Sequence, residues 1–303
     1  MENILLERIK SKKRLLDSMR PFPKQALKKL QKQFETELIY NSNAIEGNTL
    51  TLRETEMVLE RGITVKGKSL QEHLEIINHK EALSNLKEFV KKKAPLTEKL
   101  IKQIHKAILM KINDGEAGRY RRLNVRILGA IKSPPQYVKV PKLMLEFIKD
   151  IQKSKDLHPV ELSAKVHYEF VRIHPFFDGN GRTARLIMNL ILMQKGYPVT
   201  IILNNDRKKY YDTLKKADFG DIKPFVNFVG RMAERSLNLY LSAFKKGMEF
   251  IELKEATKYC SYSQEYLSLL ARKGILDSIK IGRTWFTTKK AIDEYLRKQS
   301  LMK

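Results

Sequence analysis

Apolar residues recur at helical spacing along most of the chain up to Phe244. In residues 23–46 they recur at helical spacing, and Gly47 follows where a helix would end. These apolar positions are Ala26, Leu27, Leu30, Phe34, Leu38 and Ile45. The same spacing predicts helices at residues 51–59, 69–90, 97–110, 142–153, 159–171, 182–194, 206–217 and 223–244. We expect the strongly apolar 182–194 segment at the centre of an all-helical body.

Two segments depart from this pattern. Residues 118–140 are rich in β-branched residues and contain two consecutive prolines, which predicts a short hairpin or flap. After Gly247 the pattern becomes helix, turn, helix, two short strands and helix. Gly274 would end the second of these helices, and Gly282 with Arg283 would turn the chain between the strands. This order predicts a small C-terminal winged helix, an α+β domain.

Composition changes the expected partners more than the expected fold. The 303 residues suffice for two or three compact units, and 59 Lys and Arg against 34 Asp and Glu give a net charge of +25. Such a charge attracts nucleic acid, nucleotides or acidic protein surfaces, although solvated Lys-rich helix faces are the alternative. Cys260 is the only cysteine, which excludes an intrachain disulfide and fits a cytoplasmic setting. No apolar run approaches the roughly 18 residues of a membrane span, so no membrane contact is expected.

The sequence HPFFDGNGRTAR, residues 174–185, connects two predicted helices with a loop suited to phosphate chemistry. Gly179 and Gly181 free the backbone to form a nest of N–H groups, and the following helix directs its positive end to the same place. Asp178 offers the hard oxygen ligand that Mg²⁺ prefers. A nucleotide phosphate with its metal ion would therefore fit this loop.

Arg182 and Arg185 lie one helical turn apart and can project together onto outer phosphates. His174 is then left to act as a general base. Taken singly, each of these residues has a structural explanation, since capping, surface and hydrogen-bonding roles are common for them. The combination and its spacing are what indicate a functional site.

The pattern HxFxDGNGRxxR matches every position of the motif of the Fic family, which this chain resembles from about residue 97 to residue 244. The resemblance also covers the preceding HYEFVRI and the later KKYYDTLKKADFGDIKPF. It implies an all-α Fic core with a short β-hairpin flap. Members of the family bind ATP with Mg²⁺ and transfer AMP to a Ser, Thr or Tyr hydroxyl of a target protein, and such an enzyme could also modify itself.

The resemblance assigns roles within the loop. The implied roles are catalytic base for His174, core anchor for Phe176, metal ligand for Asp178, α-phosphate cradle for Asn180 with the Gly179 and Gly181 amides, and outer-phosphate contacts for Arg182 and Arg185. Tyr210 and Tyr211 match a tyrosine pair near the adenine. Asp218 stands where relatives often have Asn, which leaves the base selectivity open.

The flap of relatives docks the hydroxyl-bearing segment of the target as an added strand. The matching residues here are Ile127, Leu128, Gly129 and Ala130. A plain surface hairpin is the alternative interpretation of this segment.

The segment SNAIEGN resembles the inhibitory motif of the family through Ser42, Glu46 and Gly47. A glutamate at a helix C-terminus is disfavoured by roughly 0.3–1 kcal/mol, so helix stability does not explain Glu46. The resemblance implies that Glu46 pairs with Arg185 and occupies the γ-phosphate position. An exposed terminal glutamate without function is the alternative.

The predicted C-terminal domain resembles the winged helix-turn-helix of MerR-like and excisionase-like DNA-binding proteins over residues 249–297. Its second helix offers Gln264, Ser268 and Arg272 to base edges. Contact with DNA is one possible role, and docking or dimer contact is the other. The whole chain is thus expected to hold an N-terminal helical region with the inhibitory helix, a catalytic core and the winged helix. Their boundaries are 1–95, 96–247 and 248–303.

Three functions fit the sequence. The first is an AMP transferase autoinhibited by Glu46, with a homodimer expected from the resemblance. The second is a DNA-binding regulator whose Fic core senses nucleotide, although sensing needs no base such as His174. The third is a Fic enzyme that removes AMP or transfers another phosphate-linked group.

The remaining histidines are expected to be structural. His105 and His167 lie among apolar residues and are predicted to be buried hydrogen-bonding groups. His73, His79 and His158 are predicted to lie at the surface.

Overall fold

The computed structural model describes residues 1–127, 131–154, 156–244, 249–281 and 284–300. Contacts divide the chain into two compact units. The first unit comprises Met1–Leu6 and Pro23–Ser236, and the second comprises Glu7–Phe22 and Leu237–Lys303. Two helices, α1 (Asn3–Ser18) and α10 (Lys223–Phe244), contribute residues to both units.

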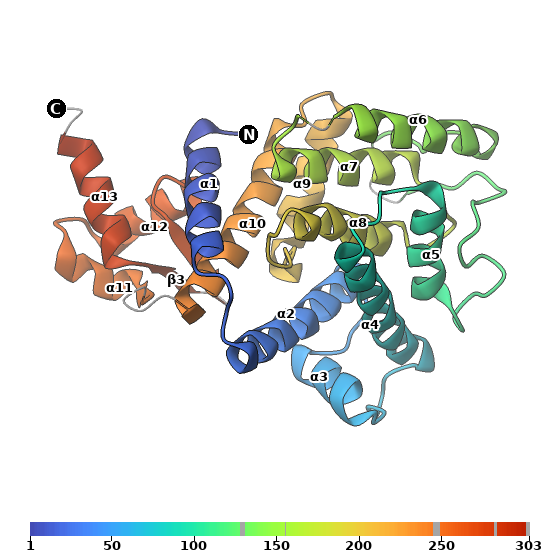
Figure 1. The fold of residues 1–303 in the computed structure, drawn as a ribbon, viewed down its shortest axis with the longest axis horizontal. Helices are drawn as coiled ribbons and strands as arrows, with labels where there is room; N and C mark the ends of the chain where they lie inside the picture. Colours follow the sequence, from blue (N-terminus) through green and yellow to red (C-terminus); the bar gives the residue numbers. More distant parts are fainter. Residues whose placement is uncertain (128–130, 155, 245–248, 282–283, 301–303) are drawn as a thin grey trace. The chain divides into compact units, whose positions relative to one another are not determined.

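The described part of the first unit consists of helices and loops (Figure 1). Besides its parts of α1 and α10 it holds α2 (Lys24–Ile45), α3 (Leu52–Arg61), α4 (Leu70–Lys91), α5 (Glu98–Leu109), α6 (Val140–Lys153), α7 (Pro159–Ile173), α8 (Asn180–Gln194) and α9 (Arg207–Asp218). The helices predicted from apolar spacing are confirmed, each to within a few residues. Capping boxes at Thr51 and Ser69 begin α3 and α4.

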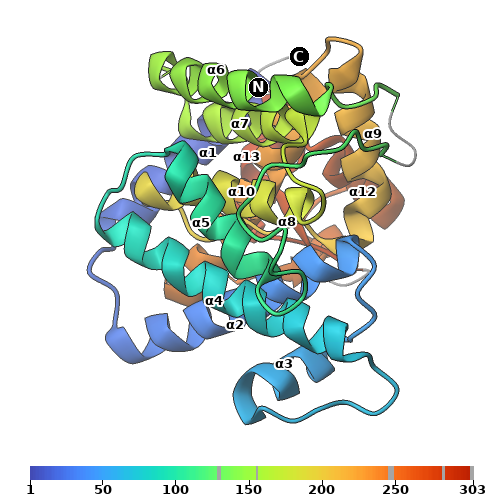
Figure 2. The same ribbon diagram turned by 90° about the vertical axis from the view of Figure 1, so that its right-hand side faces the viewer.

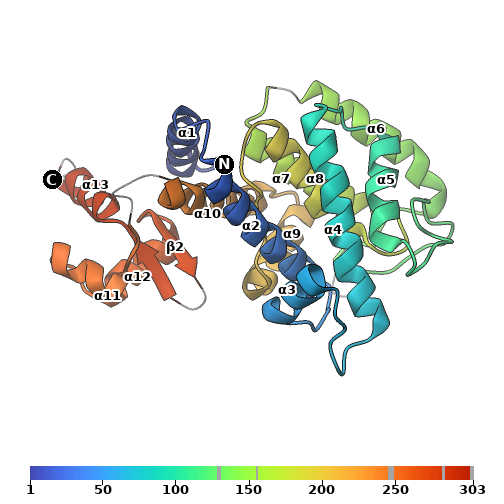
Figure 3. The same ribbon diagram turned by 60° about the horizontal axis from the view of Figure 1, so that its bottom comes forward.

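The central helix is α8, which packs against α7, α4, α5 and α2 (Figures 1 and 2). Its residues from Arg182 to Leu192 are all buried, and from Leu186 onward they are mostly apolar, as a helix enclosed on every side requires. Asn189 is a polar exception whose amide donates to the carbonyls of Arg185 (3.0 Å) and Thr200 (2.9 Å). Figure 3 shows α2, α3 and α4, which pack on one another on one side of this core.

The hairpin predicted for residues 118–140 is wrong for the residues that the structure describes. Residues 119–127 and 131–136 contain no strand. Leu128, Gly129 and Ala130, which were assigned to the flap, lie outside the described residues.

Arg121 holds this segment in a non-strand conformation. Its buried guanidinium donates to the carbonyls of Leu123 (3.0 Å), His174 (2.8 Å) and Pro135. These bonds satisfy carbonyls that a strand ladder would otherwise use, and the two prolines have no N–H for such a ladder. A three-residue helical turn, Tyr137–Lys139, then leads into α6.

Two of the remaining histidine predictions are wrong. His73 and His79 are buried on α4 rather than exposed, because α4 is covered by α2, α3, α5 and α8. His73 accepts from the main-chain N–H of Val65 at 2.8 Å, and Nδ1 of His79 lies 3.3 Å from the Asn43 amide nitrogen. His158 is half-buried.

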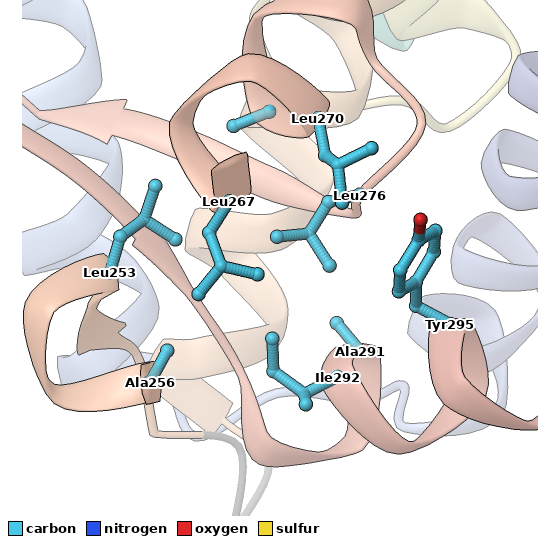
Figure 4. Close-up of a cluster of buried hydrophobic side chains, with 9 residues drawn as sticks. Leu253, Ala256, Leu267, Leu270, Leu276, Ala291, Ile292 and Tyr295 are labelled. Atoms are coloured by element: carbon cyan, nitrogen blue, oxygen red, sulfur yellow. The ribbon is translucent and has the colours of Figure 1, made fainter. Parts of the chain in front are cut away.

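The second unit contains a three-stranded antiparallel sheet in the order β1-β3-β2. The strands are β1 (Ile251–Glu252), β2 (Ser278–Ile281) and β3 (Thr284–Thr287). The helices α11 (Leu253–Ala256), α12 (Gln264–Lys273) and α13 (Lys289–Ser300) accompany them. Figure 4 shows the core of this unit, where Leu267, Leu270 and Leu276 lie close to Ile292.

Much of the second unit follows the predicted order of elements, with β1 as an unpredicted addition. Gly274 ends α12 with a φ of 71°, as expected. Gly282 and Arg283 lie outside the described residues. The first helix, α1, was not predicted. Its Lys12 forms an ion pair of 2.6 Å with Asp277 inside this unit.

None of the helices within the described residues combines the length and the apolar character that crossing a bilayer requires.

Candidate active site

The loop between α7 and α8 is shaped by two left-handed residues and one buried ring. His174 ends α7 with φ 50° and ψ 61°, and Gly179 precedes α8 with φ 73°. Between them Phe176 is fully buried and stacks on the His105 ring, with 3.6 Å between ring centres. The core anchor expected at Phe176 is therefore present.

Asn180 braces this loop from inside. Its side-chain amide donates to the carbonyl of Phe176 at 2.9 Å, and its side-chain oxygen accepts from the N–H of Phe176 at 3.0 Å. Both ends of the side chain are thus engaged by the main chain. Any contribution of Asn180 to an anion site would come from its main-chain N–H at the start of α8.

Burial, with a smaller effect from the positive charge of Arg121, lowers the pKa of His174 to about 4. The hydrogen bond with the Val171 carbonyl and the charges of Glu46 and Asp178 act in the opposite direction. Nδ1 lies 3.3 Å from the Val171 carbonyl, which can only accept, so Nδ1 carries the proton. The imidazole is therefore neutral at pH 7, with the lone pair on Nε2 available to take a proton.

The first turn of α8 presents main-chain N–H groups that have no acceptor within their own helix. Asp178 lies beside this turn, and its carboxylate forms an ion pair with Arg182 at 3.1 Å. Arg182 is buried and also reaches Glu75 of α4 at 3.5 Å. The positive end of α8 and this arginine together favour an anion at the turn.

The carboxylate of Glu46 already lies at this anion site. A Cβ atom built on Gly181 would stand 2.2 Å from Oε1 of Glu46, so only glycine leaves room for the carboxylate here. Arg185 donates from Nη2 to the same oxygen at 2.7 Å. The pair expected between Glu46 and Arg185 is thus present in the structure.

Ser42 completes the contacts of Arg185, which is 1% exposed. Nε donates to the Ser42 hydroxyl at 2.9 Å, and Nη2 donates to the Ser42 carbonyl at 2.7 Å. Burial acts to lower the pKa of Arg185, but the Glu46 carboxylate together with Tyr210 and Tyr211 outweighs it, and the pKa is raised. The end of α2 and the first turns of α8 therefore meet at one guanidinium.

The conformation at the end of α2 directs the Glu46 side chain toward α8. Glu46 is the C-cap of α2, and Gly47 follows with a φ of 106°, a conformation that glycine adopts without strain. The N–H of Gly47 donates to Ala44 (3.1 Å) and that of Asn48 donates to Asn43 (3.1 Å), which closes the helix end.

A cavity of about 330 Å³ is lined by residues of α7, of α9 and of the segment that precedes α6. Its walls include Tyr211, Leu214 and Asp218 of α9, and Tyr168 of α7. Asp218 accepts a hydrogen bond of 3.2 Å from the Tyr168 hydroxyl. Ile127, the described member of the predicted flap residues, also lines this cavity. It is the candidate pocket for the nucleotide base.

The rings of Tyr210 and Tyr211, which were predicted to lie near the adenine, are in contact, with 5.0 Å between ring centres. Tyr211 lines the cavity, whereas Tyr210 is buried behind it. The Tyr210 hydroxyl lies 3.2 Å from Nε2 of His167, and its ring packs with Phe225 and Phe228. Burial raises the pKa of Tyr210, so its hydroxyl is neutral. Tyr210 is a core residue in this structure.

Among the described residues, no three His, Cys, Asp or Glu side chains are grouped closely enough to hold a metal ion by themselves. Mg²⁺ is commonly held by one or two carboxylates together with substrate phosphates. The Asp178 side chain is 58% exposed beside the anion site, so its hard oxygens fit that arrangement.

Local sequence patterns did not single out three residues that the structure brings to the site. They are Glu75, Arg121 and Arg207. Each one contacts the site from an element that is distant in sequence, and its neighbouring residues do not distinguish it from other charged residues. The apolar pattern of the loop does not predict that Arg121 is buried.

Comparison with known proteins agrees with this geometry. Residues 95–192 match the model of the Fic/DOC family. A protein adenylyltransferase Fic from Drosophila virilis is 41% identical over 218 residues, which cover 72% of this chain and 45% of the relative. The chain thus spans less than half the length of that curated relative.

Two solved structures extend the comparison. A Fic domain containing signaling protein from Bacteroides thetaiotaomicron is 33% identical with a TM-score of 0.75, covering 80% of this chain and 98% of the other. A Fic family protein from Desulfovibrio desulfuricans is 22% identical with a TM-score of 0.67, covering 95% and 96%, and shows the shared fold. This chain belongs to the Fic/DOC family.

Proposed function

We propose that the protein is an adenylyltransferase that moves AMP from ATP to a Ser, Thr or Tyr hydroxyl of a target protein, itself included. The observation that carries the proposal is a neutral His174 on the same loop as an anion site at the start of α8. A nucleotide-sensing module would need the anion site but not the base. The curated relatives named as adenylyltransferases support the same reaction.

In this mechanism Nε2 of His174 accepts the proton of the target hydroxyl while its oxygen attacks the α-phosphorus. The new P–O bond forms as the bond to the bridging oxygen of pyrophosphate breaks. Main-chain N–H groups of the first turn of α8 stabilise the charge that develops on the α-phosphate. Arg182 and Arg185 hold the outer phosphates. Asp178 would hold Mg²⁺, which neutralises phosphate charge.

We further propose that Glu46 inhibits this reaction. Its carboxylate takes the place of a phosphate at α8 and occupies Nη2 of Arg185 at 2.7 Å. ATP bound beside Glu46 would lose its contact with Arg185, and its outer phosphates would be repelled by the carboxylate. The triphosphate would then lie out of line for attack.

The test compares wild type, Glu46→Gly, Glu46→Gln and the double variant His174→Ala/Glu46→Gly. Each is incubated with labelled ATP, Mg²⁺ and lysate, and labelled protein is scored. We expect strong labelling from Glu46→Gly and less from Glu46→Gln, which keeps the side-chain volume but removes the charge. The double variant should lose at least about 100-fold, the scale of general-base catalysis. Equal labelling by wild type and Glu46→Gly would refute the inhibition.

Protein labelled in this way also serves to test AMP removal. Wild type, with Glu46 in place, is added to it after ATP has been removed. Release of label by wild type but not by the double variant would establish removal as a second reaction of the same site.

We propose that the second unit is a winged helix-turn-helix. The support is its order of elements: α11, α12, the β2 and β3 strands and α13 around one apolar core. Gln264, Ser268 and Arg272 of α12 are the side chains that would reach DNA bases. If the unit binds duplex DNA and the binding weakens steeply as salt is raised, α12 is a DNA-binding helix. If no binding is measured at any salt concentration, the unit is assigned to protein docking instead.

A further inference from the structure

Arg207, the first residue of α9, contacts the end of α2 and the wall of the base cavity at the same time. Its Nε donates to the carbonyl of Ile45 at 2.8 Å. Its guanidinium carbon lies 4.9 Å from the centre of the Tyr211 ring. Both Arg207 and Tyr211 line the cavity of about 330 Å³.

The contact with Ile45 acts on the peptide next to Glu46. The last four carbonyls of a helix have no partner within the helix, and a cation there is favoured by the helix dipole. Ile45 is the last residue of α2, and Glu46 follows as its C-cap. Arg207 therefore fixes the main chain from which the Glu46 side chain reaches α8, and it offsets the unfavourable placement of a carboxylate at a helix C-terminus.

The contact with Tyr211 acts on the base cavity. Burial raises the pKa of Tyr211, the charge of Glu46 raises it further, and Arg185 and Arg207 lower it. The phenol thus lies within electrostatic reach of the inhibitory pair. Bases and guanidinium groups both stack on the faces of aromatic rings, so a ring face that holds Arg207 is closed to a base.

From these contacts we infer that Arg207 is a positioning residue that couples base binding to the seating of Glu46. A base bound against Tyr211 competes with the guanidinium of Arg207, and loss of that guanidinium loosens the end of α2. Because coupling between two sites is reciprocal, a well-seated Glu46 must also weaken base binding. The inference rests on the proposed function for its catalytic readout, but the coupling itself can be measured without catalysis.

Lys208 provides the matched control. It is the next residue of α9, carries the same charge, and its side chain is 92% exposed in an ion pair with Asp212. Lys208→Ala removes one positive charge from the same helical turn without touching α2 or the cavity. Arg207→Ala and Lys208→Ala are each made in wild type and in Glu46→Gly.

The first readout is hydrogen exchange of the peptide that covers the end of α2. The amides of Gly47 and Asn48 donate to the Ala44 and Asn43 carbonyls there. In wild type we expect Arg207→Ala, and separately saturating ATP, to speed their exchange by about tenfold or more, the effect of losing a hydrogen bond from a charged donor. Lys208→Ala should leave exchange unchanged. Unchanged exchange with both Arg207→Ala and ATP would overturn the inference.

The second readout is labelling from ATP. Arg207→Ala should raise labelling by wild type on the order of fivefold and should not raise it in Glu46→Gly, where no carboxylate remains to be seated. If Arg207→Ala lowers labelling by the same factor in wild type and in Glu46→Gly, the inference is overturned. Such a result would mean that Arg207 only supports the fold or the cavity. If hydrogen exchange changes as expected but no variant labels protein, the coupling between base binding and Glu46 is supported. That result would count against the proposed AMP transfer alone.

Discussion

At the scale of single residues, the environment of His174 sets the pH dependence of the proposed reaction. Burial holds its pKa at about 4, far below the 6.5 of a solvated histidine. A general base works in its neutral form, so activity should fall only as the pH drops toward 4. In Glu46→Gly we therefore expect a flat rate between about pH 6 and 8. A loss of activity centred near pH 6.5 would show that His174 is not buried in the working enzyme.

Asp218 leads to a prediction about the nucleotide base. A carboxylate only accepts hydrogen bonds, whereas the Asn often found here in relatives can donate or accept. With Asp218 fixed by the Tyr168 hydroxyl at 3.2 Å, the cavity should favour an amino group over a carbonyl group on the facing edge of the base. Asp218→Asn in Glu46→Gly should narrow the preference for ATP over GTP by about tenfold. Competition between the two labelled nucleotides measures this, and an unchanged preference would contradict the role.

The spacing of the loop residues predicted the contact that the structure shows between α2 and α8. Glu46 of α2 reaches Gly181 and Arg185 of α8, whereas the roles of His174 and Asp178 stay predictions. What the sequence could not predict are the contacts made across the fold. Asn180 turns inward to the main chain of Phe176, and Tyr210 turns into the core, because both depend on packing between distant helices.

At the scale of elements, the turn before α8 depends on glycine. Gly179 has a φ of 73°, and a Cβ there would lie 3.3 Å from Nε2 of His105. Gly179→Ala should therefore lower the free energy of unfolding by about 1–3 kcal/mol. Gly115 has ordinary space around it and no positive φ, so Gly115→Ala is the control and should change stability by less than about 1 kcal/mol. Urea unfolding measures both, and equal effects would contradict this account of the turn.

Helix periodicity predicted the long elements and failed for the short or atypical ones. The helix α1 is so rich in charge that its apolar side was not recognised, although Leu5, Ile9 and Leu16 are buried. The strand β1 has two residues, too few for an alternating pattern. The predicted hairpin failed because Arg121, a residue of the segment itself, satisfies its carbonyls and those of the neighbouring loop.

At the scale of the whole molecule, buried histidines tie stability to pH. Burial lowers the pKa of His105 to about 4 and that of His167 to about 3. Between pH 6.5 and about 3 the unfolded chain binds protons that the folded chain excludes, so the unfolding free energy must fall as the pH falls. We expect urea midpoints to decrease from pH 7 to pH 4.5, with a shallower decrease in His167→Gln. An equal slope in both proteins would contradict the buried neutral state of His167.

The division of the chain into a helical region, a core and a winged helix at residues 95 and 247 stays a prediction. Contacts group the chain into two units instead, and residues 7–22 belong with the C-terminal one. Lys12 of α1 pairs with Asp277 there at 2.6 Å. A long-range ion pair of this kind leaves no trace in local composition, which is why residues 7–22 were predicted to belong with the inhibitory helix.

The most direct test of the account is the position of the transferred phosphorus. Glu46→Gly is incubated with ATP labelled in the α-phosphate or in the γ-phosphate, with Mg²⁺ and lysate, beside His174→Ala/Glu46→Gly. The account predicts that α-label enters protein from Glu46→Gly, that γ-label does not, and that the double variant transfers neither. Transfer of γ-label, or of no label at all, would contradict an AMP transferase controlled by Glu46.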